Sequence, residues 1–227
     1  MALWVASQRS PMRRTRVLFA LLCGLLSLPA GADDDWSQRE SRNGVTVAAR
    51  PLAGSKVEEL QGRMVVDFPA ERVFAVLADV EHYPEIVPPT VIANRLRSEG
   101  EDITYYYMEI DPPVVARRFY CIRVERGADA DGLLRSAWRP ANELCPEADR
   151  GKVRIEATEG EWTVRALDAE HAEVVYHAHT DPSGAIPAWM VNRVQPGQLR
   201  EIMESVRRAA ALARYDRTAA SCGPELR

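Results

Sequence analysis

The feature that most constrains the fold is a series of eight segments in which apolar and polar residues alternate. They span residues 44–54, 56–68, 91–103, 104–110, 117–128, 132–140, 153–167 and 172–181. Alternation with a period of two is typical of strands that bury one face. Short connections with glycine, proline or charged residues separate the segments, and short connections join antiparallel neighbours. The sequence therefore predicts an antiparallel sheet.

Two helical segments interrupt this pattern. The first is short, from Ala70 to Val80 after Pro69, and Tyr83-Pro84 is expected to end it. The second is long, from Pro187 to about Arg214 with a potential break at Pro196, and it carries apolar residues at helical spacing. We expect an α+β fold in which a curved antiparallel sheet wraps around the long C-terminal helix. A sheet that wraps a helix can leave a hydrophobic cavity between them.

The N-terminal segment resembles a secretory signal peptide. Arg13, Arg14 and Arg16 precede an apolar run from Val17 to Leu28, and Ala30-Gly31-Ala32 supplies a small-x-small cleavage site. The apolar run is shorter than the roughly 20 residues that a membrane span needs. We therefore predict a signal peptide at 1–32, one domain at 33–214, a flexible tail at 215–227, and a periplasmic or secreted location.

The charge balance excludes one class of partner. Residues 1–32 hold four of the 29 basic residues and no acidic one, so 25 basic residues remain against 33 acidic ones, a net charge of −8. Binding to a nucleic-acid backbone depends on clustered positive charge. We therefore expect no nucleic-acid partner.

Three cysteines follow the predicted cleavage site, at 121, 145 and 222. In an oxidising compartment disulfides can form, and Cys121 and Cys145 flank a predicted hairpin. A disulfide between these two and a set of free, buried thiols are both compatible with the sequence. The chain has no CxxC motif, so it gives no support for a zinc ribbon or a thioredoxin-type site.

Several motifs resemble START domains (steroidogenic acute regulatory-related lipid transfer) and their helix-grip relatives. The run MVVDFPAERVFAVLADVEHYPEIVP at 64–88 is similar to their strand, short helix and aromatic-proline hook. Upstream, Trp36, Gly44-Val45, Arg50 and Gly54-Ser55 resemble the family's opening pattern, and EGEW at 159–162 with DPSGAIPAWMVN at 181–192 resembles its closing strand and entrance to the last helix. The resemblance spans nearly all of the mature chain and implies a cavity that binds a hydrophobic ligand.

The chain departs from the family pattern after the segment YYYMEIDPPVV. Relatives carry Asp-Arg-Asp there, whereas this chain has Ala116-Arg117-Arg118. The arginine at 117 is kept and both acids are lost, so the pattern no longer supplies an ion-pair partner for Arg117.

The face of each strand that points inward is predicted from the charged residues on the opposite face. Because Glu109 and Arg123 are expected to point outward, the residues directly before and after each of them should point inward. A bulge could reverse the assignment within a strand, most readily at Gly160. Together with the last helix, these assignments give the candidate ligand-binding residues Tyr106, Met108, Arg117, Tyr120, Ile122, Ser136, Trp138, Trp162, Tyr176, Ala178, Trp189, Ile202, Met203 and Val206. Loop 181–187 contains Pro182, Gly184 and Pro187, a composition that suits a gate as well as a plain turn.

Catalytic and metal motifs are scarce. The sequence contains no GxSxG, Walker A, HExxH or GxGxxG motif. His177 and His179 share one side of a strand, but they share it with Glu173 on the predicted solvent face and have no clear third ligand. We therefore expect no cofactor, no metal and no catalytic residue.

Three classes of function fit these features. The first is an exported protein, expected to be a monomer, that binds or transfers a lipid or another hydrophobic small molecule and makes transient contact with a membrane. The second is a cyclase or hydratase of the same superfold, with an inward tyrosine or Arg117 as the acid. The third is a non-catalytic interaction module whose cavity has collapsed. The sequence does not identify the ligand.

Overall fold

The computed structural model describes residues 36–113, 115–147 and 151–216 of the 227-residue chain. The predicted signal peptide at 1–32 and Cys222 lie outside the described residues, as does the predicted tail beyond residue 216.

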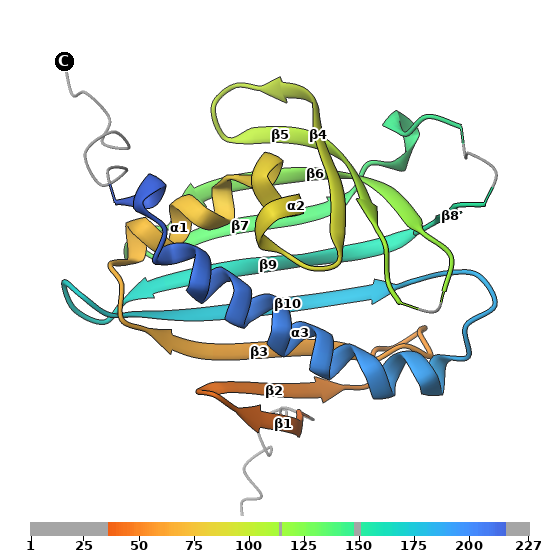
Figure 1. The fold of residues 1–227 in the computed structure, drawn as a ribbon, viewed down its shortest axis with the longest axis horizontal. Coiled ribbons are helices and arrows are strands. Elements are labelled where there is room, and N and C mark those ends of the chain that lie inside the picture. The colour runs from red at the N-terminus through yellow and green to blue at the C-terminus, as the bar shows by residue number, and fades with distance from the viewer. Residues whose placement is uncertain (1–35, 114, 148–150, 217–227) are drawn as a thin grey trace, which may run out of the picture. The chain divides into compact units, whose positions relative to one another are not determined.

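Ten strands form a single curved sheet, which confirms the predicted fold class (Figure 1). The strands are β1 (Ser37–Arg42), β2 (Val45–Arg50), β3 (Glu59–Val66), β4 (Thr90–Glu99), β5 (Ile103–Ile110), β6 (Arg118–Ala128), β7 (Leu134–Pro140), β8 (Val153–Arg154), β9 (Ala157–Ala166) and β10 (Ala172–Asp181). The order across the sheet is β1-β2-β3-β10-β9-β7-β6-β5-β4, with antiparallel pairing throughout. The short strand β8 pairs in parallel with β6.

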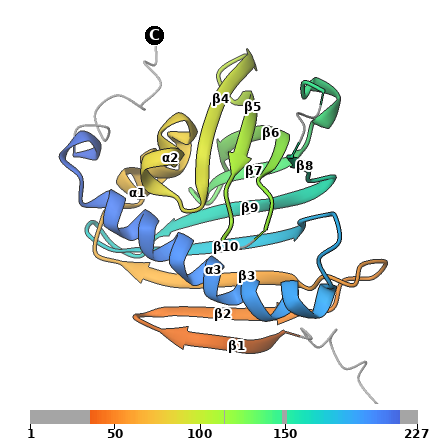
Figure 2. The ribbon, with the colours of Figure 1, turned by 45° about the vertical axis from the view of Figure 1, so that its right-hand side comes forward.

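The helices lie on one face of this sheet. They are α1 (Ala70–Ala78), α2 (Tyr83–Ile86) and α3 (Ala188–Ala210), with 3-10 turns η1 (Val80–His82) and η3 (Ala213–Tyr215) beside them. A further 3-10 turn, η2 (Asn142–Leu144), belongs to the segment after β7. Both ribbon views show α3 crossing the strands around β10, with α1 and α2 beside its C-terminal end (Figures 1 and 2). The long helix therefore closes the concave face of the sheet.

Both predicted helices differ in detail from the structure. The first ends at Ala78, and Tyr83-Pro84 does not terminate it but begins α2, because proline is tolerated in the first turn of a helix. The second continues through Pro196 without a break. Burial of the Pro196 ring offsets part of the backbone hydrogen bond that a proline removes.

The strand predictions also need three corrections. Strand β1 was not expected, and segment 153–167 divides into β8 and β9. No bulge occurs at Gly160, where the pairing of β9 with β10 keeps its register. The glycine instead makes room for an aromatic ring, since a Cβ at this position would lie 2.6 Å from Cζ2 of Trp138.

The main hydrophobic core lies between α1, strands β2 and β3, and the C-terminal half of α3. Its fully buried members include Val45, Val47, Met64, Val73, Val76, Leu77, Met203, Val206 and Ala210. Tyr215 also packs against this core, and its hydroxyl donates a hydrogen bond of 2.9 Å to Asp79. The folded unit therefore extends at least one residue beyond the predicted boundary at 214.

The outer face of β5 and β6 is covered rather than exposed. A disulfide joins Cys121 to Cys145 and holds the segment after β7 against β6. The side chain of Asn142 accepts a hydrogen bond from the amide of Cys121 at 3.0 Å and donates one to the carbonyl of Ile155 at 2.9 Å. Glu109, whose charge marked this face as outward, is 1% exposed and pairs with Lys152 at 2.6 Å.

Within the described residues, none of the helices combines the length and hydrophobicity that crossing a bilayer requires.

Candidate functional site

A cavity of about 370 Å³ lies between the concave face of the sheet and the N-terminal half of α3. Strands β3, β5, β6, β7, β9 and β10 form its floor, and α3 with the loops at 87–89 and 182–186 and residues Pro112, Pro113 and Val115 forms its cover. Met190 and Val194 line the cavity and are 40% and 47% exposed, so the cavity reaches the surface along the first turns of α3. Its volume is within the range of roughly 300–1,000 Å³ that is usual for small-molecule sites.

Aromatic side chains form one wall of the cavity. The ring of Tyr176 packs between Trp162, with centroids 4.3 Å apart, and Trp138, with centroids 5.3 Å apart. These residues stand on β10, β9 and β7, which are neighbours in the sheet, so the pleat brings all three rings to the same face. The wall offers a large apolar surface with few polar atoms.

The cavity tyrosines are poor proton donors. Burial raises the pKa of Tyr120 to about 12 and also raises the pKa of Tyr83 and Tyr176. The hydroxyl of Tyr83 donates a hydrogen bond of 2.8 Å to the carbonyl of Leu77. All three groups stay neutral at physiological pH and can only offer hydrogen bonds.

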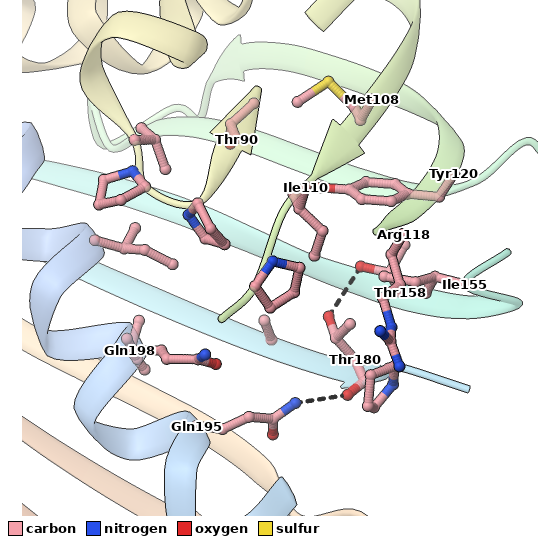
Figure 3. Close-up of a pocket in the computed structure, with 18 of the residues that line it drawn as sticks. Thr90, Met108, Ile110, Arg118, Tyr120, Ile155, Thr158, Thr180, Gln195 and Gln198 are labelled. Atoms are coloured by element: carbon pink, nitrogen blue, oxygen red, sulfur yellow. Dashed lines mark hydrogen bonds between the residues drawn. The ribbon is translucent and has the colours of Figure 1, made fainter. Parts of the chain in front are cut away.

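Polar groups gather at the end of the cavity nearest loop 182–186 (Figure 3). The hydroxyls of Thr158 and Thr180 hydrogen-bond to each other at 2.9 Å, and Gln195 of α3 donates to the carbonyl of Thr180 at 2.9 Å. The indole nitrogen of Trp138 donates to Thr158 at 3.4 Å. These bonds tie β9, β10 and α3 together at this end of the cavity.

Arg118 is the one charged residue among those that line the cavity. It begins β6 and is 3% exposed, and Figure 3 shows its side chain at the same end of the cavity as Thr158 and Thr180. Its Nη1 donates a hydrogen bond to the carbonyl of Ala116. Burial lowers the pKa of Arg118, but the group begins far above neutrality and stays charged.

Nine of the residues predicted from the sequence line this cavity. They are Met108, Tyr120, Ile122, Ser136, Trp138, Trp162, Tyr176, Ala178 and Ile202. They come from five strands and one helix and were assigned by strand parity or helical spacing, so the structure brings together side chains that are far apart in the sequence.

Five predicted residues lie elsewhere. Tyr106 is buried beside the cavity, and its hydroxyl accepts a hydrogen bond of 2.7 Å from Arg126. Met203 and Val206 lie in the packed core, and Trp189 is 65% exposed on the outer side of α3. Arg117 points away from the cavity because it pairs with Asp111 at 2.9 Å and with Glu109 at 3.6 Å.

Sequence reasoning missed Arg118, Thr158, Thr180 and Gln195. Arg118 lies two residues before Tyr120 on β6, Thr158 four before Trp162 on β9, and Thr180 four after Tyr176 on β10. Residues separated by an even number face the same side of a strand, so this alternation could have identified all three. The loop residues that line the cavity, Pro88, Pro89, Pro112, Pro113, Val115 and Ile186, show no periodicity that could have identified them.

The two histidines of β10 lie apart from the cavity. His177 pairs with Glu59 at 2.7 Å, and His179 is 8% exposed with a contact of 3.0 Å to the hydroxyl of Ser55. His179 is therefore not on a solvent face as predicted. Across the residues that the structure describes, no three His, Cys, Asp or Glu side chains gather in a way that could hold a metal ion.

The curved sheet, the long C-terminal helix and the cavity between them define a helix-grip fold. The model of the START domain family matches residues 16–213, and the chain therefore belongs to this family.

Relatives and solved structures agree with this assignment. An uncharacterized protein of Pseudomonas aeruginosa is 28% identical over 160 residues, which cover 70% of this chain and 78% of that protein. Human START domain-containing protein 10 is 25% identical over 71% of this chain, a match that spans only 56% of the human protein. The crystal structure of a STAR-related lipid transfer protein fragment from Xanthomonas axonopodis superimposes with a TM-score of 0.73 at 25% identity, covering 79% of this chain and all of that one.

Proposed function

We propose that the chain is a lipid-binding protein that carries a hydrophobic ligand in the cavity between the sheet and α3. The observation that carries this proposal is a cavity of about 370 Å³, lined mostly by apolar side chains, inside a START domain. The similarity to the lipid transfer protein of Xanthomonas axonopodis supports the same function.

The energetics of the cavity favour an occupant. At ~24 cal/mol per Å³, an empty cavity of about 370 Å³ would cost roughly 9 kcal/mol. That cost is comparable to the whole free energy of unfolding of a typical domain, ~5 to 15 kcal/mol. A ligand that fills the space removes the penalty. The open volume of about 370 Å³ itself argues against an interaction module with a collapsed cavity.

A carrier with such a cavity can move a lipid through water. Each methylene group that leaves a bilayer for water costs ~0.8 kcal/mol, so a chain of 16 carbons faces roughly 13 kcal/mol. Enclosure among aromatic and aliphatic side chains removes most of this penalty.

The residues of the cavity give less support to a cyclase or hydratase. An effective general acid needs a pKa close to the working pH, and burial moves the pKa of Tyr120, Tyr83 and Tyr176 away from neutrality. Arg117, the other candidate acid, lies outside the cavity in an ion pair with Asp111. The geometry of the cavity therefore favours a protein that binds its ligand without catalysis.

Location and partners form part of the same proposal. The basic and apolar pattern of residues 1–32 supports export to the periplasm or the medium. The proposal takes the exported chain to be a monomer. Trp189, Met190 and Val194 expose apolar surface on the first turns of α3, where the cavity opens. Tryptophan is favoured at membrane interfaces, so this surface is suited to transient contact with a bilayer during ligand exchange.

Native mass spectrometry of the protein expressed with its own N-terminal segment tests the proposal. We expect the periplasmic fraction to contain a chain that begins at Asp33 and carries a non-covalent adduct with the mass of a lipid. Denaturation should release the adduct and leave the mass of the chain alone. A ligand-free protein that also binds no lipid after delipidation would contradict the proposal.

A further inference from the structure

Arg118 is a buried cation without a counter-ion in the described part of the chain. Its side chain is 3% exposed, its Nε atom is buried without a hydrogen-bond partner, and its one hydrogen bond goes to the neutral carbonyl of Ala116. The nearby acids are already engaged with Arg117, which pairs with Asp111 and Glu109. A guanidinium group has five N–H donors, so most of its capacity is unused.

Such a group is costly for a protein to retain. An unpaired buried charge strongly destabilises a fold, and buried polar atoms without partners are rare enough to need an explanation. The charge cannot be removed by deprotonation, because arginine stays protonated in proteins. An anion that enters from outside would supply the missing partner.

We propose that Arg118 binds the carboxylate head of a single-chain amphiphile such as a fatty acid, whose chain extends along the apolar wall formed by Trp138, Trp162 and Tyr176. This assignment rests on the proposed function and specifies the class of ligand. Arg118 has donors in a planar fork that matches both oxygens of a carboxylate.

The charge of the cavity favours a carboxylate over other lipid heads. Arg118 supplies one positive charge, and no Asp, Glu, Lys or second Arg stands among the residues that line the cavity. A carboxylate neutralises this charge, whereas a phosphate monoester brings about −1.5 to −2 and leaves an excess of negative charge in a dry site. A zwitterionic head would bring a cation for which the lining has no acid.

The size of the cavity favours a single chain. Its volume of about 370 Å³ is near the lower end of the range of small-molecule sites, roughly 300–1,000 Å³. A lipid with two acyl chains would need considerably more space.

The head site lies beside the loop that follows β10. A Cβ added to Gly184 would lie 4.0 Å from Nη2 of Arg118 and 3.5 Å from Cγ1 of Val153. Gly184 and Ser183 both have positive φ, at 75° and 58°, so the loop makes a tight turn beside the end of the arginine side chain. An anion bound by Arg118 would therefore contact the loop that covers this end of the cavity.

Competition with a fluorescent fatty acid tests this assignment on the delipidated protein. The probes are palmitic acid and hexadecanol, which share a chain of 16 carbons and differ in the charge of the head. We expect palmitate to bind the native protein roughly ten- to a hundredfold more tightly than hexadecanol, the range that a charge-assisted hydrogen bond provides. In Arg118→Gln this preference should disappear, because palmitate weakens while hexadecanol is unchanged.

Two further variants keep the test decisive. Arg118→Lys retains the charge and should retain part of the preference for palmitate. Arg117→Gln removes the adjacent arginine, which lies outside the cavity, and should bind both probes like the native protein. Thermal melting of each variant without ligand shows that the fold is intact.

Each remaining outcome contradicts a specific part of the account. Equal binding of palmitate and hexadecanol by the native protein would overturn the role of Arg118 and leave the lipid-carrier function standing. Tighter binding of lysophosphatidic acid than of palmitate would overturn the carboxylate and assign the site to a phosphate. Failure of every probe to bind would contradict the proposed function itself.

Discussion

The two halves of α3 face interiors of different kinds. The C-terminal half buries Met203, Val206 and Ala210 completely against β2, β3 and α1. The N-terminal half covers the cavity with Val191, Gln195 and Gln198, and its first turns leave Trp189 largely exposed. One continuous helix therefore serves as a core element at one end and as the cover of a binding site at the other.

The composition of the two faces explains the difference. In the C-terminal half, the buried positions carry apolar or small side chains, and the buried hydroxyl of Ser205 donates within the helix to the carbonyl of Ile202 at 2.7 Å. In the N-terminal half, the inward face includes Gln195 and Gln198, which line the cavity beside Thr180 and Arg118. Polar side chains on an inward face are tolerated where they meet hydrogen-bond partners, ligand or water. Polar side chains on the inward face therefore distinguish the half of α3 that covers the cavity.

The largest effect should come from truncating one side chain of α3 in the core and one that borders the cavity. We expect Met203→Ala to lower the free energy of unfolding by ~2 to 5 kcal/mol, because it leaves a cavity in a packed core. Ile202→Ala should cost about 1 to 2 kcal/mol, because Ile202 is half-buried and borders existing space. Chemical denaturation measures both, and equal costs would contradict the distinction between the packed core and the cavity.

Close packing in the core half also predicts an effect at Gly62 of β3. A Cβ here would lie 2.2 Å from Sδ of Met203 and 3.3 Å from Cγ of Leu199, so we expect Gly62→Ala to cost ~1 to 3 kcal/mol. In the Met203→Ala background the closest contact is gone, and the same substitution should cost less. Gly127→Ala in β6 is the control, because a Cβ there meets nothing within 4 Å. Additive costs in the double variant would refute close packing at this point.

In the cavity half, added bulk should affect binding more than stability. Ala178 of β10 lines the cavity, and we expect Ala178→Trp to abolish the binding of a fluorescent fatty acid while the melting temperature stays close to that of the native protein. The ring occupies space that the ligand needs. Val65→Trp on β3, where the native side chain is 51% exposed, is the control and should bind normally. A large fall in melting temperature for Ala178→Trp would indicate a filled core.

The smallest effect on stability is expected at the exposed start of α3. Trp189→Ala should change the free energy of unfolding by less than ~0.5 kcal/mol, as is usual for surface positions. It should nevertheless slow the transfer of a fluorescent fatty acid between vesicles, because an interfacial tryptophan is lost. Leu167→Ala, in the hairpin between β9 and β10, removes a side chain that is 53% exposed and serves as the control. Equal transfer rates for both variants would exclude this surface from membrane contact.

Much of the fold could be predicted because local patterns and charges agree with it. Alternation around Met108, Ile122 and Trp138 identified strands, and charged neighbours indicated which side of each strand faces inward. The pattern was insufficient where a distant segment covers the sheet. Glu109 has the charge of a surface residue, yet the segment held by the Cys121–Cys145 disulfide buries it.

The candidate site was predictable in its walls but not at its charged end. The family pattern drew attention to Arg117, the arginine that this chain shares with its relatives. Arg118 takes the place of an acid in that pattern, but it has the parity of Tyr120 and Ile122 and turns into the cavity with them. Alternation along β6 would have identified the arginine of the cavity, whereas the family pattern did not. Helical spacing on α3 could not separate Ile202 from Met203, because both lie on apolar faces and only tertiary packing distinguishes them.

Hydrogen exchange with and without palmitate tests the division of α3 most directly. At short labelling times, before global unfolding contributes, the account predicts slower exchange on ligand binding in loop 182–187 and in residues 188–199. Residues 203–210, which the core already protects, should exchange at the same slow rate in both states. Bound palmitate that leaves 182–199 unchanged, or that slows exchange equally along the whole helix, would contradict the claim that the ligand lies beneath the N-terminal half of α3.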